Sequence, residues 1–371
     1  MPTSGRSLYF HIPFCHKKCP YCHFFVLPND ASLKKRFLCA LFSEWEERAP
    51  LLQNCPITSI YFGGGTPSLI GPEAIAQILA KISRNNPACE ITLEINPEGI
   101  SLEEMRAFAA VGINRVSIGV QSLDDALLKI LGRTHSAKEA LFAIETTHRA
   151  GIENISIDLM YEVPHQTLSV WEKTLSLLPS LPLKHLSLYN LTFEEGSLFY
   201  KERKEWERVL PAAEEGLKML ELATRSLPIF GLNRYEISAF AKEGFFSRHN
   251  VGYWTARPFL GFGPSAFSYW NGCRFRNICH LARYETALRE KRSPVNFEEK
   301  LPFPKNLEEL LAVQLRLIQG VDLSLFPPLP ESIWKKVERL LAKGWLTLKG
   351  SQLQLSEEGL LFYDSVASEI I

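Results

Sequence analysis

The stretch YFHIPFCHKKCPYC, residues 9–22, decides how the chain is interpreted, because it joins an apolar strand to a loop with three cysteines. Cys15, Cys19 and Cys22 follow the spacing C-x3-C-x2-C, which lets one loop place three thiolates around a single inorganic centre. Three thiolates on a four-iron cube leave one iron free for a chelating small molecule. The spacing therefore predicts a [4Fe-4S] cluster with an open iron.

Zinc is the alternative occupant of the same thiolates, with a histidine as the fourth ligand. His11, His16 and His23 are all available for that role. Zinc knuckles more often use paired C-x2-C units, and a structural zinc does not need the glycine run GGGTP at 63–67. A bound amino-acid ligand does need backbone that it can approach closely. The two motifs together favour the cluster, and a zinc-stabilised barrel without radical chemistry stays open as a third interpretation.

Apolar and β-branched runs alternate with segments of helical periodicity along the first part of the chain. Repeated strand and helix units predict a parallel sheet buried on both faces, and six such units can curl into an open barrel. We therefore predict an α/β fold with a partial (β/α)6 barrel, in which the loops after the strands carry the chemistry. The expected strands are 8–12, 59–62, 90–95, 115–120, 154–160 and 185–190, and the expected helices include 32–48, 72–84 and 102–110.

The chain is expected to divide into three parts, with the barrel at 1–235. A charged stretch at 201–208 predicts the solvated start of a helix. Residues 236–300 form a connecting region, in which the aromatic and glycine-rich segment 248–270 predicts loops and short strands. Residues 301–371 predict helix, helix, hairpin and helix, a smaller α+β domain that is winged-helix-like. No basic stripe marks a DNA-recognition helix there, so packing or partner docking is favoured.

The composition excludes several classes of function. Lys plus Arg and Asp plus Glu both number 41, so the net charge gives no electrostatic basis for binding nucleic acid or anionic lipid. The N-terminus MPTSGRSLYF lacks the apolar core of a secretory signal, and no run approaches the ~20 apolar residues of a spanning helix. We expect a cytoplasmic protein that binds no nucleic acid.

Taken together, YFHIPFCHKKCPYC and the later YFGGGTPS at 61–68 resemble the radical S-adenosylmethionine superfamily, in the branch related to oxygen-independent coproporphyrinogen III oxidase. The resemblance continues through LEINPE, GVQSLD, LGRTH, DLMY, RYEIS and the C-terminal module. It implies S-adenosylmethionine on the open iron of the cluster, whose reduction cleaves the sulfonium to give a carbon radical. It also implies an electron donor such as flavodoxin or ferredoxin.

The resemblance further implies which residues surround the cofactor, although it assigns no catalytic residue. Carboxylates suit ribose hydroxyls and an ammonium group, and a forked guanidinium suits a carboxylate. Tyr9 and Tyr21 are expected beside the cluster and cofactor, Gly64, Gly65 and Thr66 at the methionine amino group, and Glu94, Gln121, Arg133, Asp158 and Thr192 around the nucleoside and carboxylate.

Two functions compete within this branch. One is the oxidase, which removes two propionate carboxyl groups from a porphyrinogen. The other is the haem chaperone of the HemW type, which binds haem and passes it to respiratory or other haem proteins. The oxidases carry a fourth cysteine two residues after the last cluster ligand, where this chain has Phe24. They also carry a substantial N-terminal extension, where this chain has only about seven residues before the first strand.

The segment RHNVGYW at 248–254 contains HNxxYW, the motif that the resemblance associates with haem binding in the chaperones. The imidazole of His249 suits haem iron, Tyr253 is a candidate second ligand, and Trp254 suits stacking on the macrocycle. From the residues alone, these side chains would more readily satisfy loop backbone and fill the core. The motif favours the chaperone only through the resemblance.

We therefore interpret the chain as a haem chaperone, with the oxidase as the alternative. Transient contact with membrane-bound haem acceptors is compatible with this interpretation. The sequence leaves open the identity of the acceptor, covalent or non-covalent haem attachment, productive cleavage of S-adenosylmethionine and the oligomeric state. It also leaves open the role of His23, which stands where related chaperones often have an acidic residue.

Overall fold

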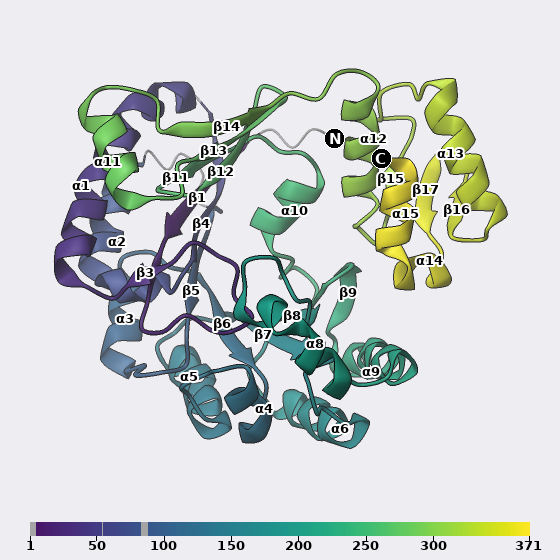
Figure 1. The fold of residues 1–371 in the computed structure, drawn as a ribbon, viewed down its shortest axis with the longest axis horizontal. Coiled ribbons are helices and arrows are strands. Elements are labelled where there is room, and N and C mark those ends of the chain that lie inside the picture. The colour runs from purple at the N-terminus through teal and green to yellow at the C-terminus, as the bar shows by residue number, and fades with distance from the viewer. Residues whose placement is uncertain (1–4, 54, 83–87) are drawn as a thin grey trace.

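The structure is a computed structural model that describes residues 5–53, 55–82 and 88–371. Its centre is a sheet in the order β14-β13-β12-β11-β1-β4-β5-β6-β7-β8-β10-β9, and six neighbouring strands of this sheet run parallel and curve into an open barrel (Figure 1). The six predicted strands are confirmed. They are β1 (Arg6–Ile12), β4 (Ile57–Gly64), β5 (Glu90–Ile95), β6 (Arg115–Gln121), β7 (Asn154–Tyr161) and β8 (His185–Asn190).

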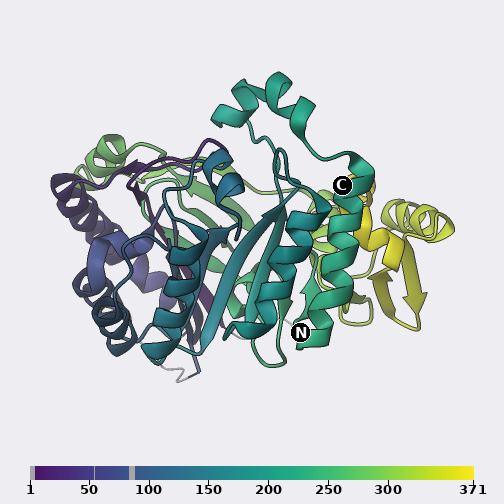
Figure 2. The same ribbon diagram turned by 90° about the horizontal axis from the view of Figure 1, so that it is seen from below.

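Helices cover the outer face of this barrel, as the alternating pattern predicts (Figures 1 and 2). The predicted helix at 72–84 ends at Ala80, and its last two expected positions lie outside the described residues. The covering helices are α1 (Ala31–Arg48), α2 (Gly71–Ala80), α3 (Leu102–Ala110), α4 (Asp125–Ile130), α5 (Ala137–Arg149), α6 (Leu168–Leu177) and α9 (Ala213–Ser226).

Side-chain caps fix where several of these helices begin. Asp30 accepts a hydrogen bond of 2.8 Å from the amide of Leu33 at the start of α1. Ser136 and Glu139 form a capping box at the start of α5. The Asp30 cap ends the loop that carries the cysteines, and the capping box ends the turn between α4 and α5.

The region 236–300 extends the barrel sheet at both edges. Strand β11 pairs in parallel with β1, so that Leu8 lies opposite Leu260. Beyond β11 the strands run antiparallel, and β9 and β10 do the same at the other edge. The added elements are β9 (Asn233–Glu236), β10 (Ala239–Ala241), β11 (Phe259–Phe262), β12 (Phe267–Trp270), β13 (Cys273–Asn277), β14 (Val295–Glu299) and α11 (Leu281–Arg289).

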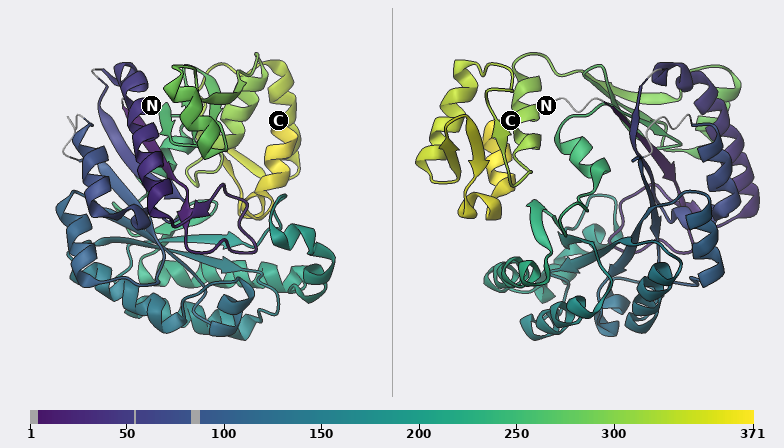
Figure 3. Two further views of the ribbon diagram at one scale, coloured as in Figure 1. Left: turned by 60° about the vertical axis from the view of Figure 1, so that its left-hand side comes forward. Right: turned by 180° about the vertical axis from the view of Figure 1, so that it is seen from behind.

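Residues 248–254 form a helix, α10 (Arg248–Trp254), where the sequence predicted loops and short strands, so that part of the prediction is wrong. The Ser247 side chain caps the helix by accepting from the amide of Asn250. The carboxylate of Glu90 accepts from the amides of Arg248 and His249 at 2.9 and 3.0 Å. Glu90 lies far away in the sequence, so local propensity could not reveal this second cap. Helix α10 stands between the sheet and the C-terminal unit (Figures 1 and 3).

Short helices and strands complete the barrel part of the chain. The charged stretch at 201–208 begins no long helix, because two short helices and a 3-10 turn occupy it before α9 starts at Ala213. The short helices are α7 (Leu198–Lys201) and α8 (Arg203–Trp206), and a two-stranded pair, β2 (Phe14–Cys15) and β3 (Leu27–Pro28), shapes the cysteine loop.

The C-terminal unit has its own apolar core, which includes Leu311, Ile333, Val337 and Val366. Its order follows the predicted helix, helix, hairpin and helix, except that a short strand lies between the first two helices and the last helix is divided into two. Among the residues described, no helix is both long and apolar enough to cross a membrane. The elements are α12 (Lys305–Gln314), β15 (Val321–Asp322), α13 (Glu331–Ala342), β16 (Leu346–Lys349), β17 (Gln352–Leu355), α14 (Glu357–Leu361) and α15 (Tyr363–Ile370).

A buried ion pair fixes the added strands to helix α1. Arg48 Nη1 lies 2.6 Å from Glu44 Oε1, and Arg48 Nη2 donates to Asn277 Oδ1 at 2.9 Å. Glu44 Oε2 accepts from the Gly263 amide at 2.7 Å and from the Tyr284 hydroxyl at 2.5 Å. Burial raises the pKa of Glu44, and the charge of Arg48 opposes that rise. The packing of the added strands against α1 therefore depends on buried charges whose ion pair and hydrogen bonds are satisfied.

Replacing Arg48 by Met should destabilise the fold, because the Glu44 carboxylate would lose its ion pair while staying buried. The expected loss is about 3–5 kcal/mol in the free energy of unfolding, measured by urea denaturation. The matched control is Arg36→Met. Arg36 of α1 pairs with Glu285 of α11 at the solvent-exposed surface. Equal effects of the two substitutions would contradict a stabilising role for the buried network.

Candidate functional site

The carboxyl ends of the parallel strands open into a pocket of about 410 Å³, a volume typical of small-ligand sites. Most residues that the resemblance assigns to the cluster and cofactor line this pocket, and they come from the carboxyl ends of the barrel strands and from the segments that follow them. They are Cys15, Cys19, Tyr21, Cys22, Gly64, Gly65, Thr66, Glu94, Gln121, Arg133, Asp158 and Thr192.

The three cysteines of the loop are free, half-buried thiols at one side of the pocket. Cys15 Sγ lies 3.6 Å from Thr66 Oγ1, and Arg133 Nη1 lies 3.6 Å from Cys19 Sγ. Burial raises the pKa of Cys15 to about 11, against the effect of the Thr66 contact. Across the described ranges, no three His, Cys, Asp or Glu side chains gather as ligands of one metal ion. Thiols that border a pocket fit ligands at separate corners of a cluster.

The glycine run after β4 packs directly against the cysteine loop. Gly64 has a φ of +109°, and a Cβ there would lie 2.5 Å from the His11 ring. A Cβ on Gly65 would lie 2.7 Å from the Phe14 carbonyl oxygen. The Thr66 amide donates to that same carbonyl at 2.7 Å. Only glycine lets the two loops meet this closely, so the run shapes the wall of the pocket beside the thiols.

Arg133 crosses the pocket floor and is held by a polar network. Its Nη2 donates to Asn96 Oδ1 at 2.8 Å and to the Gly119 carbonyl at 2.9 Å, while Asn96 Nδ2 donates to Thr66 Oγ1 at 3.1 Å. Its Nε is buried and has no hydrogen-bond partner within the part of the chain that is described. A buried guanidinium with a spare donor suits a bound carboxylate. Asn96 was not predicted, although the NPE sequence after the third strand carried the signal.

Two partly buried carboxylates face the pocket from strands β5 and β7, which lie on either side of β6. Glu94 accepts from the Tyr61 hydroxyl at 2.7 Å and from the Gly64 amide at 3.1 Å. Burial raises the pKa of Glu94 to about 7, although the Tyr61 hydrogen bond opposes the rise. Burial also raises the pKa of Asp158, which accepts from Ser117 Oγ at 3.4 Å. A bound ammonium group would restore the ionised form of Glu94, so this side suits a cationic ligand.

Gln121, Thr192 and Tyr9 differ in how they relate to the pocket. Gln121 has a φ of 64° at the end of β6, a conformation that costs energy for a side chain other than glycine and is frequent at functional sites. Thr192 lines the pocket and donates to Glu194 at 3.1 Å. Tyr9 lies behind the wall, where its hydroxyl is 3.1 Å from His11 Nδ1.

His249 of the HNxxYW motif is buried, with 1% of its surface exposed, and both ring nitrogens are engaged. Nδ1 lies 3.0 Å from Ser59 Oγ, and Nε2 lies 2.8 Å from the Tyr253 hydroxyl. Because Ser59 donates its proton to Ser7 Oγ, the ring must donate from Nδ1 and accept the Tyr253 proton at Nε2. Burial lowers the pKa of His249 to about 3, and Arg257 adds to this effect. The imidazole is therefore neutral.

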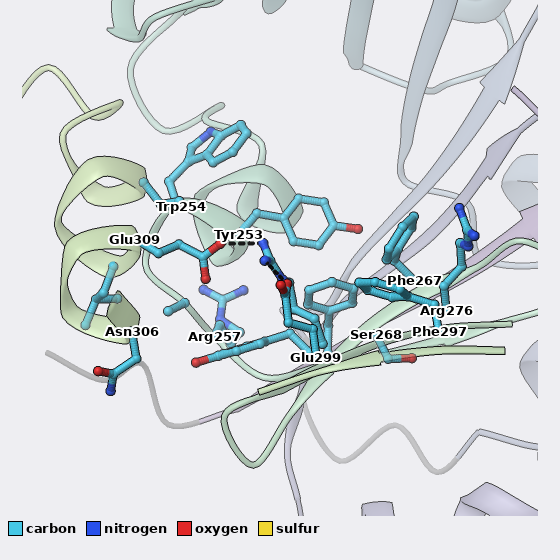
Figure 4. Close-up of a pocket in the computed structure, with 16 residues that line it drawn as sticks. Tyr253, Trp254, Arg257, Phe267, Ser268, Arg276, Phe297, Glu299, Asn306 and Glu309 are labelled. Atoms are coloured by element: carbon cyan, nitrogen blue, oxygen red, sulfur yellow. Dashed lines mark hydrogen bonds and ion pairs between the residues drawn. The ribbon is translucent and has the colours of Figure 1, made fainter. Parts of the chain in front are cut away.

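Tyr253 and Trp254 lie on a different cavity, of about 600 Å³, between α10, the strands β12–β14 and helix α12 (Figure 4). His249 does not line it. The ring of Tyr61, which holds Glu94 on the first pocket, lies 4.8 Å from the His249 ring, between ring centroids. A row of contacting side chains, from Glu94 through Tyr61 and the buried His249 to Tyr253, thus runs from one cavity to the other.

The protein is a curved α/β barrel with three thiols and a polar, cofactor-sized pocket at the ends of its strands. These features place it in the class of cluster-binding barrel proteins. Residues 9–178 match the family model of the Radical SAM superfamily, and residues 304–362 match that of the HemN C-terminal domain. The fold is similar to that of the coproporphyrinogen III oxidase HemN from Escherichia coli, with a TM-score of 0.85 and 23% identity over 100% of this chain and 91% of that one.

Two kinds of relative match nearly the whole chain. The mitochondrial radical S-adenosyl methionine domain-containing protein 1 of Danio rerio is 33% identical, over 98% of this chain and 86% of its own. The heme chaperone HemW of Haemophilus influenzae is 31% identical, over 97% and 96%, and that of Bacillus subtilis is 32% identical, over 86% of each. The chain therefore belongs to the radical S-adenosylmethionine superfamily, in the family that includes the HemW proteins. That superfamily implies a [4Fe-4S] cluster and S-adenosylmethionine.

His249 should make the fold sensitive to acid. Its pKa is lowered in the folded state, so the unfolded chain takes up a proton there as the pH falls from 6.5 toward 3, and the folded chain does not. This proton should reduce the free energy of unfolding by up to about 1.4 kcal/mol per pH unit in that window. Urea denaturation of the wild type and of His249→Asn at pH 6.5, 5.5 and 4.5 measures the slope.

The readout is the difference in slope between the two proteins, which does not depend on how stable the variant is at neutral pH. His148→Asn is the matched control, since His148 is exposed on α5. Identical slopes for wild type and His249→Asn would show that the buried ring takes up its proton in the folded state.

Proposed function

We propose that this protein is a haem chaperone, which binds haem together with a [4Fe-4S] cluster and S-adenosylmethionine and passes the haem to acceptor proteins. The observation that carries the proposal is the position of HNxxYW, whose Tyr253 and Trp254 line an aromatic cavity apart from the cluster pocket. Phe24, half-exposed at the cluster pocket, supports it, because the oxidases have a cysteine there. The relatives named heme chaperone support it over most of the chain.

In this proposal Cys15, Cys19 and Cys22 hold the cluster. When bound, the reduced cluster supplies the electron that cleaves the sulfonium of S-adenosylmethionine. The spare Nε donor of Arg133 holds the methionine carboxylate, and the amino group lies at Gly64, Gly65 and Thr66. There the Glu94 carboxylate, which accepts from the Gly64 amide, adds a negative charge, in addition to its expected place near the nucleoside. The remaining contacts are assigned to Tyr21, Gln121, Asp158 and Thr192, with Tyr9 supporting the wall from behind, and His249, Tyr253 and Trp254 serve haem.

The proposed partners follow from the chemistry of the site. Lys17 and Lys18 are exposed at the rim of the cluster pocket, where they would attract an acidic electron donor such as flavodoxin or ferredoxin. The acceptors are respiratory or other haem proteins, including membrane-bound ones reached by transient contact. We assign the chaperone to the cytoplasm, where electron donors of this kind and newly made haem acceptors meet.

One anaerobic preparation with quantified iron and sulfide tests the proposal. Haem is titrated into it and followed by absorbance, and a second portion is given coproporphyrinogen III, S-adenosylmethionine and reductant. We expect saturable haem binding and no protoporphyrinogen IX, under conditions in which a known oxidase turns over. Turnover without haem binding would show that the protein acts as the oxidase and would overturn the proposed chaperone function.

Loss of any one thiol should remove the cluster. Cys15→Ala, Cys19→Ala and Cys22→Ala are each expected to lose most of the bound iron and sulfide and the visible absorbance of the cluster, because a cube held by two thiolates is labile. Cys39→Ala is the matched control, since Cys39 is exposed on α1. Unchanged iron and sulfide in all three variants would exclude these cysteines as the cluster ligands.

A further inference from the structure

The cavity beside α10 has an aromatic lining that continues to the protein surface. Phe267 and Phe297 are 45% and 39% exposed, and their ring centroids lie 6.3 Å apart in an edge-to-face arrangement. Figure 4 shows them at one end of the cavity, with Trp254 toward the other. Tyr253 packs its ring against Phe259 in the wall between them, at 4.6 Å between centroids. These side chains offer a flat apolar ligand a long aromatic surface.

Arg276 supplies a cation at the exposed end of this lining. Its guanidinium lies 5.4 Å from the ring centroid of Phe267 and 5.9 Å from that of Phe297. Its Nε is buried and unsatisfied, and no described carboxylate forms an ion pair with it. A partly exposed guanidinium with a spare Nε donor, set on aromatic rings, is arranged to bind a carboxylate that belongs to an apolar ligand.

The neighbouring arginine is used differently. Arg274 forms ion pairs with Glu299 of β14 and Glu309 of α12 at the same time. Two carboxylates already neutralise its charge, and its ion pairs connect the sheet wall of the cavity to the wall from the C-terminal unit; Figure 4 labels the two glutamates. Of these two arginines on β13, Arg276 is the one whose charge is left for a ligand.

The position of His249 limits which residues of the HNxxYW motif can contact such a ligand. His249 lies behind Tyr253 and accepts the hydroxyl proton of that residue at Nε2. Tyr253 and Trp254 reach the cavity, and His249 does not. His249 is therefore a positioning residue here, which acts by orienting the Tyr253 hydroxyl.

We propose that this cavity is the haem pocket, in which the macrocycle lies between the aromatic walls and a propionate binds the Arg276 guanidinium. The ligand class is an iron porphyrin with free carboxylates. The inference rests on the proposed haem-chaperone function and deepens it by giving the ligand a site remote from the cluster pocket. Size, aromatic lining and a carboxylate-seeking arginine in one cavity are the observations that carry it.

The test compares iron protoporphyrin IX with its dimethyl ester, which has the same ring and no free carboxylate. Dissociation constants are measured for the wild type, Arg276→Ala, Phe267→Ala and the control Arg203→Ala, whose arginine stacks on Tyr200 elsewhere on the surface. Arg276→Ala should weaken haem binding by about tenfold or more and leave ester binding unchanged. Phe267→Ala should weaken both ligands, and the control neither. Thermal melting of each variant monitors folding.

The outcomes separate the pocket from the function. If the wild type binds haem and both cavity variants bind it equally well, the pocket assignment is overturned while the haem-chaperone function stands. If Arg276→Ala weakens haem and ester to the same extent, carboxylate recognition by Arg276 is overturned. If the wild type binds no haem, the proposed function fails first and the pocket assignment falls with it.

Discussion

Strand β1 is paired in parallel on both sides, with β4 on one edge and β11 on the other, and the remaining architecture depends on this constraint. Because β1 is not an edge strand, the cysteine loop that follows it is held in the middle of the sheet. The partner β11 comes from a distant part of the sequence and follows directly after helix α10. The same pairing that presents the thiols therefore also places HNxxYW beside the barrel.

This arrangement gives the molecule two compartments with one common wall. The polar pocket opens at the carboxyl ends of the strands, and the aromatic cavity lies under the C-terminal unit beyond α10. Between them, Glu94 holds the Tyr61 hydroxyl, Tyr61 lies against His249, and His249 accepts from Tyr253. In the proposed function, these side chains would separate the radical chemistry in the first cavity from the macrocycle in the second. The two cavities have side chains between them, not solvent.

The local patterns were sufficient to predict the barrel, because each strand and helix shows its own periodicity. They were also sufficient to predict the face at which the loops meet, since parallel strands bring their following loops together, whereas the residues assigned to the cofactor came from the resemblance. They failed at α10, whose first turn is capped by Glu90 from a remote strand. They also missed Asn96 and Arg276, which gain their meaning only from tertiary neighbours. Arg276 lies on a short strand, and the residues near it in sequence do not indicate that its guanidinium contacts the rings of Phe267 and Phe297.

The side chains between the two cavities differ in how readily they change protonation state. His249 stays neutral at ordinary pH, and its hydrogen bonds are satisfied on both sides. Glu94 has its pKa raised to about 7, so a cation bound in the polar pocket changes its protonation. An ionised Glu94 accepts more strongly from Tyr61, whose ring contacts His249. Of these groups, Glu94 is therefore the one whose ionisation responds to a charge in the cluster pocket, whereas His249 stays neutral and keeps its contacts to Ser59 and Tyr253.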